Sequence, residues 1–391
     1  MENIAHSLVG LLTAKAGLER LSPGATSACV IAANLPDGDV LAGVYGRWFL
    51  LEHHRGITHS ILGVLVLPIL LTATYKLADL LYARIRSKIA KVRFWPLLLA
   101  SAIACATHPI LDWTNNYGIR PFLPWSGKWV YGDLVFIVDP WIWLIAGGCV
   151  FIATSYSRWR LAAWTVAWCA FFAAFALYAH RAAMPDSGWL LGIWLAGLSI
   201  FVAARITLPI NKFGQWAASA GLVLIVVYWV GLGLMHHRAL DQASSVALKI
   251  SGNSNEPILR KISENSNEQI LRIVATPTFA DPRDWLCIFE TTSATYRFPM
   301  KLGEQHGTVD WTRFVRYPKP AGKEAEFVKA ATVDPRVKIF LGFARFPVEG
   351  VLDDCLTQTL VEFADLRYTQ PGEESQGNFG LTVDVSCDDI R

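Results

Sequence analysis

The stretch Ile57-Thr-His-Ser-Ile-Leu-Gly-Val-Leu-Val-Leu-Pro-Ile-Leu-Leu-Thr-Ala-Thr-Tyr75 decides the class of fold, because a polar motif opens an apolar run that continues to residue 82. A helix needs about 20 apolar residues to cross the hydrocarbon core of a bilayer. The same criterion selects five more segments, so the predicted spans are residues 57–82, 94–113, 134–154, 159–180, 189–208 and 215–235. We therefore expect a mainly α, polytopic membrane helix bundle with six long spans.

The composition agrees with a membrane protein. Of the 391 residues, 53% are hydrophobic and 17% are charged, whereas a soluble domain has about 25% charged residues. The net charge of +3 is too small to indicate nucleic-acid binding. Two shorter apolar segments, 4–20 and 24–35, flank the turn signal Ser22-Pro23-Gly24. They predict a short N-terminal helical hairpin that spans or re-enters the bilayer.

The distribution of basic residues predicts the orientation. The loop 83–93 holds five Lys/Arg, and short basic loops stay in the cytoplasm. The polar segments 36–56 and 114–133 then face outward, as does the C-terminal part. We expect a multi-pass protein of the bacterial inner (cytoplasmic) membrane with an extracytoplasmic C-terminal domain.

Beyond a membrane domain of residues 1–238 the chain becomes polar. Residues 239–275 are expected to form a helical linker, in which Asn253–Arg260 recurs as Asn265–Arg272. Residues 276–391 are expected to form a small α+β domain. Its predicted strands are 285–291, 294–300, 360–368 and 379–385, and its predicted helices are 323–332 and 335–343. One pair among Cys287, Cys355 and Cys387 is a candidate disulfide in an oxidising compartment.

Three clusters of His and Asp residues fall at helix ends. Asp37 and Asp39 close a short apolar segment, His53–Ser60 opens the first long span, and His108 and Asp112 close the next. Antiparallel spans joined by an inside loop should bring His59 and His108 to one membrane face. His108 and Asp112 are four residues apart and point from one helix face. Imidazole and carboxylate groups are common ligands of zinc and similar divalent ions.

These clusters yield one predicted site. The expected ligands of one or two divalent metal ions, zinc first, are His6, Asp37, His59, His108 and Asp112. The expected catalytic residues are Asp39, His54 and Arg55. The histidine and arginine would orient an anionic group, and whichever Asp of the 37/39 pair does not bind metal would act as general base or support a ligand.

Each residue also has a structural interpretation. His6 can be an interfacial residue, and Asp37 and Asp39 can cap a turn. His53-His54-Arg55 can bind lipid headgroups, and His108 and Asp112 can form a structural pair. Ionisable groups at membrane depth are costly, so several at one membrane face favour function.

The ordered motifs resemble a known family. His6-Ser7-Leu8, Pro36-Asp37-Gly38-Asp39, the string His54-Arg55-Gly56-Ile57-Thr58-His59-Ser60, and His108-Pro-Ile-Leu-Asp112 are similar to those of the YdjM-like inner-membrane metal-dependent hydrolases, over about residues 1–240. Asp365–Tyr368 and Phe343–Pro347 look like the C-terminal extension of longer members. The order of ligands also resembles zinc-dependent phospholipase C, but this chain lacks that enzyme's processed N-terminal Trp and its later His and Glu ligands.

The resemblance implies a membrane-bound hydrolase acting through a metal-activated water. Residues 122–131, rich in Trp and close to the predicted site, suit a bilayer interface. They favour an ester or phosphoester in a lipid or lipid-linked substrate, although they can also be a simple interfacial anchor. The alternative function is a non-catalytic transporter or scaffold whose His/Asp cluster is structural or ion-conducting. Transporters tend to place polar sites at the bilayer midplane rather than at helix ends.

Overall fold

The computed structural model describes residues 2–181, 184, 187–251, 268–303, 308–352, 358–372 and 379–386. The chain divides into two compact units. Unit 1 comprises residues 1–39, 55–232 and 279–281, and unit 2 comprises residues 40–54, 233–278 and 282–391.

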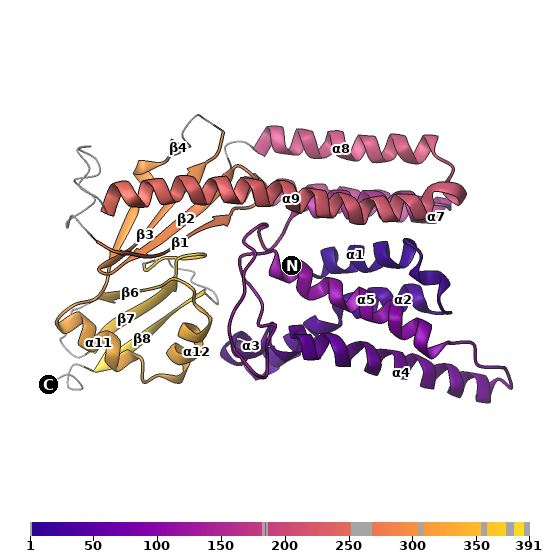
Figure 1. The fold of residues 1–391 in the computed structure, drawn as a ribbon, viewed down its shortest axis with the longest axis horizontal. Helices are drawn as coiled ribbons and strands as arrows, with labels where there is room; N and C mark the ends of the chain where they lie inside the picture. Colours follow the sequence, from indigo (N-terminus) through magenta and orange to yellow (C-terminus); the bar gives the residue numbers. More distant parts are fainter. Residues whose placement is uncertain are drawn as a thin grey trace. The chain divides into compact units, whose positions relative to one another are not determined.

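Unit 1 is helical (Figure 1). Its helices are α1 (Asn3–Lys15), α2 (Ala25–Asn34), α4 (Ile61–Ile85), α5 (Phe94–Trp113), α6 (Pro140–Thr154), α7 (Arg158–Arg181), α8 (Ser187–Thr207) and the first part of α9 (Ile210–Ser251). Short 3-10 segments, η1 (Leu18–Arg20), η2 (Leu35–Tyr45) and η3 (Ile57–His59), join several of them. Five helices are long and apolar enough to cross a membrane, namely α4, α5, α7, α8 and residues Phe213–Ile250 of α9. The expected mainly helical membrane fold is therefore confirmed.

One predicted span differs from the structure. The segment 134–154 forms a helix only from Pro140, because Asp139 caps α6 and accepts the backbone N–H groups of Trp141 and Ile142. The preceding residues pair with the end of α5 instead, where Leu134 and Val135 donate to the Thr114 carbonyl. A helix of 15 residues is about 22 Å long, less than the ~30 Å hydrocarbon core.

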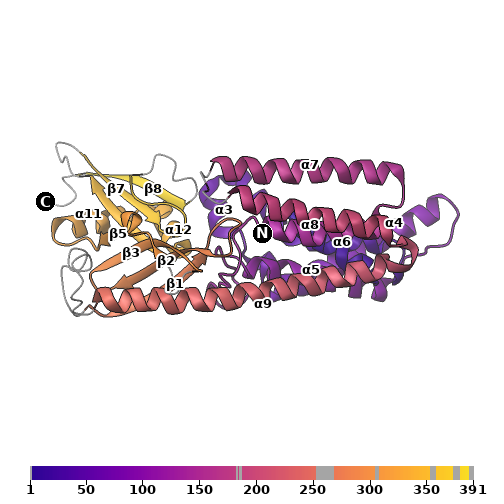
Figure 2. The same ribbon diagram turned by 90° about the horizontal axis from the view of Figure 1, so that it is seen from above.

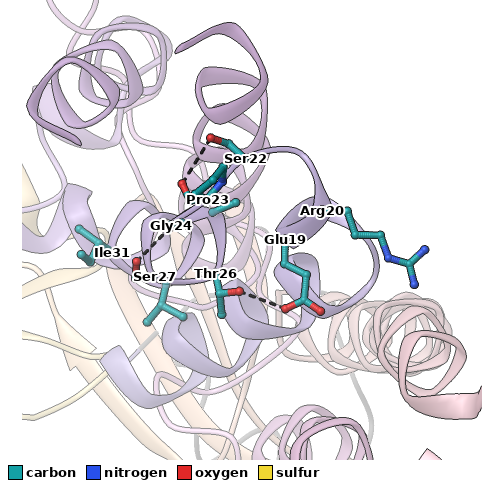
Figure 3. A pocket seen from close by; sticks show the side chains of 10 residues that line it. Glu19, Arg20, Ser22, Pro23, Gly24, Thr26, Ser27 and Ile31 are labelled. Carbon is teal, nitrogen blue, oxygen red and sulfur yellow. Dashed lines mark hydrogen bonds between the residues drawn. The ribbon is translucent and has the colours of Figure 1, made fainter. Parts of the chain in front are cut away.

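The N-terminal hairpin has the predicted two short helices. Gly10 allows close packing, because an added Cβ there would lie 2.7 Å from the Cβ of Ala33 on α2. At the turn, Glu19 accepts hydrogen bonds from Lys15 (2.6 Å) and Thr26 (3.0 Å). This turn lines a pocket of about 740 Å³ (Figure 3).

The junction between η3 and α4 positions the predicted site. The Ser60 hydroxyl caps α4 by accepting the N–H of Gly63. An added Cβ at Gly63 would lie 2.4 Å from the carbonyl oxygens of Ile57 and Thr58, so only glycine lets η3 fold onto the helix. Ile61 donates its N–H to the Pro121 carbonyl, which fixes the start of α4 to the segment that follows α5.

Unit 2 contains two antiparallel sheets (Figure 2). The first has β1 (Ile270–Pro277), β2 (Asp284–Thr291), β3 (Ala294–Lys301), β4 (Thr308–Val309) and β5 (Val315–Pro318); the second has β6 (Pro347–Leu352), β7 (Gln358–Asp365) and β8 (Gly380–Ser386). In register, Cys287 faces Phe298 and Val361 faces Val383. The helices are α3 (Arg47–His53), α11 (Lys323–Ala331), α12 (Pro335–Phe343) and the remainder of α9.

The C-terminal half of α9 belongs to the core of unit 2. Ala239, Ala243 and Ala247, spaced one helical turn apart, are fully buried in the same cluster as Trp285 and Phe289. Most of the tandem repeat lies outside the described residues, as do Cys355 and Cys387. Cys287 is a buried free thiol.

Candidate metal centre

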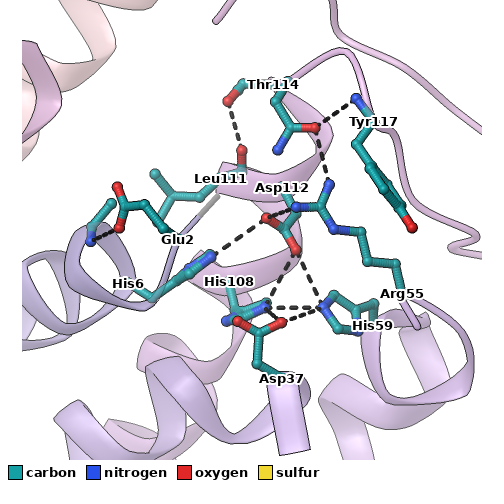
Figure 4. Close-up of polar contacts among 12 residues, drawn as sticks. Glu2, His6, Asp37, Arg55, His59, His108, Leu111, Asp112, Thr114 and Tyr117 are labelled. Atoms are coloured by element: carbon teal, nitrogen blue, oxygen red, sulfur yellow. Dashed lines mark hydrogen bonds and ion pairs between the residues drawn. The ribbon is translucent and has the colours of Figure 1, made fainter. Parts of the chain in front are cut away.

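Four buried side chains from three separate elements of unit 1 converge in one cluster. Asp37 lies in η2, His59 in η3, and His108 and Asp112 lie one turn apart on α5. Their relative exposure ranges from 0% for His108 and Asp112 to 7% for Asp37. One ligand atom of each lies within 4.8 Å of the ligand atoms of the other three (Figure 4).

The distances between these atoms are those expected around a metal ion. His59 Nε2 lies 3.3 Å from Asp37 Oδ1, 3.2 Å from Asp112 Oδ2 and 3.0 Å from His108 Nε2. His108 Nε2 lies 3.4 Å from each of the same two carboxylate oxygens. An ion with ligands at 2.0–2.1 Å in tetrahedral geometry separates neighbouring donors by about 3.3 Å. The cluster therefore fits a single divalent cation.

The outer nitrogens of the two imidazoles indicate which nitrogen of each ring carries a proton. His108 Nδ1 lies 2.6 Å from the Ala33 carbonyl, which can only accept, so this nitrogen carries the proton. His59 Nδ1 lies 3.3 Å from Asp39 Oδ2 and 3.0 Å from the Thr58 hydroxyl. In neutral rings both Nε2 atoms then present lone pairs to each other and to two carboxylates. A cation removes this repulsion, and outer hydrogen bonds of this kind are typical of metal-binding histidines.

Asp39 is not one of the four residues of the cluster but contacts one of them, His59. Its Oδ2 accepts hydrogen bonds from the Arg55 backbone N–H and the Thr58 hydroxyl, both at 2.9 Å, and lies beside the His59 ring. This arrangement orients His59. It agrees with the prediction that one Asp of the 37/39 pair holds a metal-ligand candidate in position, here Asp39 beside His59.

Asp112 uses its two oxygens differently. Oδ2 faces the two imidazoles, whereas Oδ1 lies 3.0 Å from the Arg55 guanidinium and 3.4 Å from His6 Nε2. The His6 ring stacks on His108 with centroids 3.7 Å apart. Neither ring nitrogen of His6 has a hydrogen bond in the described part of the chain. The structure therefore places His6 beside the cluster, next to Asp112 Oδ1, the oxygen that does not face His59 and His108.

Arg55 is buried beside the cluster, with 3% of its surface exposed. Its backbone has a φ of 55°, in the left-handed region. The guanidinium donates to Asn115 Oδ1 (3.0 Å) and the Gly118 carbonyl (3.3 Å), and lies 4.5 Å from the Tyr117 ring centroid. Its position thus depends on the segment that follows α5.

The pKa values of the Asp37 and Glu2 carboxyl groups are shifted in opposite directions. Burial raises the pKa of the Asp37 carboxyl, but contacts with His108 and His59 outweigh burial and hold this pKa well below its usual range. Burial raises the pKa of Glu2 to about 7, despite hydrogen bonds from the Ala5 N–H and the Trp143 indole. Asp37 is therefore ionised at neutral pH, whereas Glu2 titrates close to it.

His54 is the C-cap of α3 and is not one of the four residues of this cluster. Its catalytic role stays a prediction. The contact of His108 with the Ala33 carbonyl could not be predicted from sequence, because every residue has a carbonyl. The contacts of Thr58 with Asp39 and His59 were likewise not predicted, although Thr58 lies inside the motif His54–Ser60.

Residues 1–183, which include the whole cluster, match the family model described as "YdjM inner membrane protein". The resemblance expected from the motifs is therefore confirmed over that range. The chain is also 28% identical over 158 residues to the uncharacterized protein YfhP of Bacillus subtilis (strain 168). This alignment covers 37% of the present chain and 43% of the relative, so the chain spans less than half of that protein. No solved structure matches the chain. The family name and the five apolar helices fit a multi-pass inner-membrane protein.

Proposed function

We propose, on the premise that residues 1–183 form a YdjM-type inner-membrane domain, that the protein is a membrane-bound metal-dependent hydrolase. Its substrate class would be an ester or phosphoester in a lipid or lipid-linked molecule. One observation carries the proposal: two imidazole Nε2 atoms and two carboxylate oxygens face one another within 4.8 Å in a buried site. The chemistry of that donor set suits zinc first.

Different residues of unit 1 would bind the metal ion and hold its ligands in position. Asp37, His59, His108 and Asp112 would hold the ion, with His6 as a further candidate ligand. A divalent ion there would supply a Lewis acid that polarises an ester or phosphoryl oxygen and acidifies water. Asp39 would orient His59, or act as general base, and Arg55 would balance the charge of Asp112.

The surroundings support a lipid substrate. The cluster lies where α4 begins and α5 ends, and the following segment carries exposed aromatic side chains. Trp125 is 75% exposed and Phe122 46%. Trp at the level of lipid headgroups is typical of membrane interfaces. A substrate entering sideways from the bilayer would reach the cluster at this end of the helices, which we place on the extracytoplasmic side together with the C-terminal domain.

Metal analysis of the purified protein tests the proposal. The wild-type protein should contain at least one zinc or similar ion per chain, and a His108→Ala/Asp112→Ala variant should lose it. His180→Ala is a matched control, since His180 is an exposed residue on α7 outside the cluster. Equally low metal content in wild type and double variant would remove the metal centre.

Hydrolysis separates the enzyme from a transporter or scaffold. Detergent-purified protein should cleave a phosphodiester or carboxyl-ester lipid analogue, lose this activity with EDTA and regain it with added metal. A protein that keeps stoichiometric metal but hydrolyses none of these analogues would favour the non-catalytic alternative.

A further inference from the structure

An apolar groove lies on unit 1 away from the metal cluster. It has a volume of about 490 Å³ and is lined by side chains of α6, α7 and α8. Phe151 comes from α6, Trp168 and Phe172 from α7, and Leu198 from α8. Arg205 is the charged residue of this lining.

The groove results from uneven helix packing. Gly148 brings α6 close to α8, because an added Cβ would lie 2.4 Å from the Phe201 ring. By contrast, the large Trp168 side chain sits between α7 and Gly147 of α6. Of its 24 residues, α7 buries Trp168, Phe175 and Ala179. Apart from Trp168, the α7 side chains that line the groove are half-buried or exposed.

Two guanidinium groups lie where this groove meets the end of α6. Arg205 donates from Nε to the Ser155 hydroxyl (2.7 Å) and from a terminal nitrogen to the Ser155 carbonyl (2.6 Å). Arg160 donates to the neighbouring Thr154 carbonyl (3.4 Å). Neither arginine has a carboxylate partner in the part of the chain that the structure describes. The helix C-terminus supplies only about half a negative charge, so a net positive charge remains.

We propose that this groove binds one acyl chain of an anionic phospholipid, whose phosphate contacts Arg205 and Arg160. From Leu161 to Phe172 the lining follows α7 for about 16 Å at 1.5 Å per residue, which matches the ~15 Å depth of one leaflet. Each guanidinium has five N–H donors, of which these contacts use two in Arg205 and one in Arg160. The rest are available for phosphate oxygens, for which Arg is well suited.

Aromatic residues beside the arginines support a position at headgroup level. The Arg160 guanidinium lies 3.9 Å from the Tyr156 ring centroid, and Arg158 lies 5.4 Å from that of Trp159. Basic pockets between membrane helices recognise anionic headgroups. This site shares no residue with the metal cluster and does not depend on the proposed hydrolase activity.

Lipid binding to the full-length protein in detergent tests the inference. Phosphatidylglycerol should bind at least tenfold more tightly than phosphatidylcholine, measured by native mass spectrometry, and should raise the unfolding temperature more. Arg160→Gln/Arg205→Gln should abolish this preference, whereas Arg205→Lys should keep most of it. Arg84→Gln/Arg86→Gln is the matched control, because it removes two positive charges near the end of α4 and should change nothing.

A second variant tests the acyl-chain half of the site. Val202→Trp fills the groove and leaves both arginines in place, so it should weaken binding of both lipids. An unchanged unfolding temperature of each variant without added lipid would show that unit 1 is intact. Equal affinity of the wild type for the two lipids would overturn the inference. An equal loss of lipid preference in Arg84→Gln/Arg86→Gln would also overturn it, as would full lipid binding by Val202→Trp.

Discussion

At the residue scale, a substitution of Asp39 measures how much a residue that contacts a proposed metal ligand contributes to metal affinity. Asp39→Asn keeps the size of the side chain but weakens the contact with His59 Nδ1. Removal of such a partner typically lowers metal affinity 10–100-fold. We expect a loss of this size in competition with a chelator, and a larger one for Asp37→Asn.

Asp79→Asn is the control for this change. Asp79 accepts the Val92 N–H near the opposite end of α4, so metal affinity should not change. An Asp39→Asn protein with wild-type affinity would mean that His59 is oriented by Thr58 alone.

Acidification should release the metal. Protons compete with the metal ion for its ligand atoms, so metal binding weakens as the pH decreases. Because the pKa of Asp37 is held below its usual range, this carboxylate should stay ionised and should not be the group whose protonation releases the metal. Metal content after dialysis should be highest at neutral pH and fall as the pH decreases. Equal metal content at neutral and at strongly acidic pH would argue against histidine ligands.

The sequence predicted which residues would meet, but not how each is held. Antiparallel spans place His59 beside His108, and helical spacing adds Asp112. Asp37 and Asp39 could not be told apart, because their roles depend on which carboxylate faces the imidazoles. The contact of Arg55 with Asp112 likewise depends on a left-handed backbone and on Asn115, 60 residues away.

At the element scale, the tight junction between η3 and α4 should be sensitive to a single methyl group. In Gly63→Ala the new Cβ would lie 2.4 Å from two carbonyl oxygens, so η3 must move and displace His59. We expect lower metal content and a lower unfolding temperature. Gly192→Ala on α8 is the matched control, with no atom within 4 Å of the added Cβ. Equal behaviour of the two variants would show that η3 moves without cost.

The elements were predictable where a local pattern decides them. Hydrophobic length identified α4, α5, α7 and α8, and β-branched runs identified β2, β3, β7 and β8. Tertiary contacts decided the rest. The predicted span 215–235 continues as helix to Ser251 because an alanine stripe packs in the core of unit 2. The short strands β4 and β5 exist through pairing with β3.

At the scale of the whole molecule, the two ends of the α4–α5 pair should lie on opposite sides of the membrane. In a Cys169→Ser/Cys355→Ser/Cys387→Ser background, which removes the thiol that is exposed among the described residues and the two cysteines outside them, Trp125→Cys should react with an impermeant maleimide added to intact cells. Lys88→Cys should react only after permeabilisation, because its loop is basic. The reverse pattern would place the metal cluster on the cytoplasmic side.

The position of the donors along the chain has a consequence for biogenesis. Asp112 is the last of them, so the ribosome has made the whole set before it reaches α6, α7, α8 and α9. An ion captured at that stage would tie η2, η3 and α5 together while α7, α8 and α9 still await insertion. Metal supply would then govern how much correctly assembled protein the cell accumulates, as well as how fast each molecule turns over.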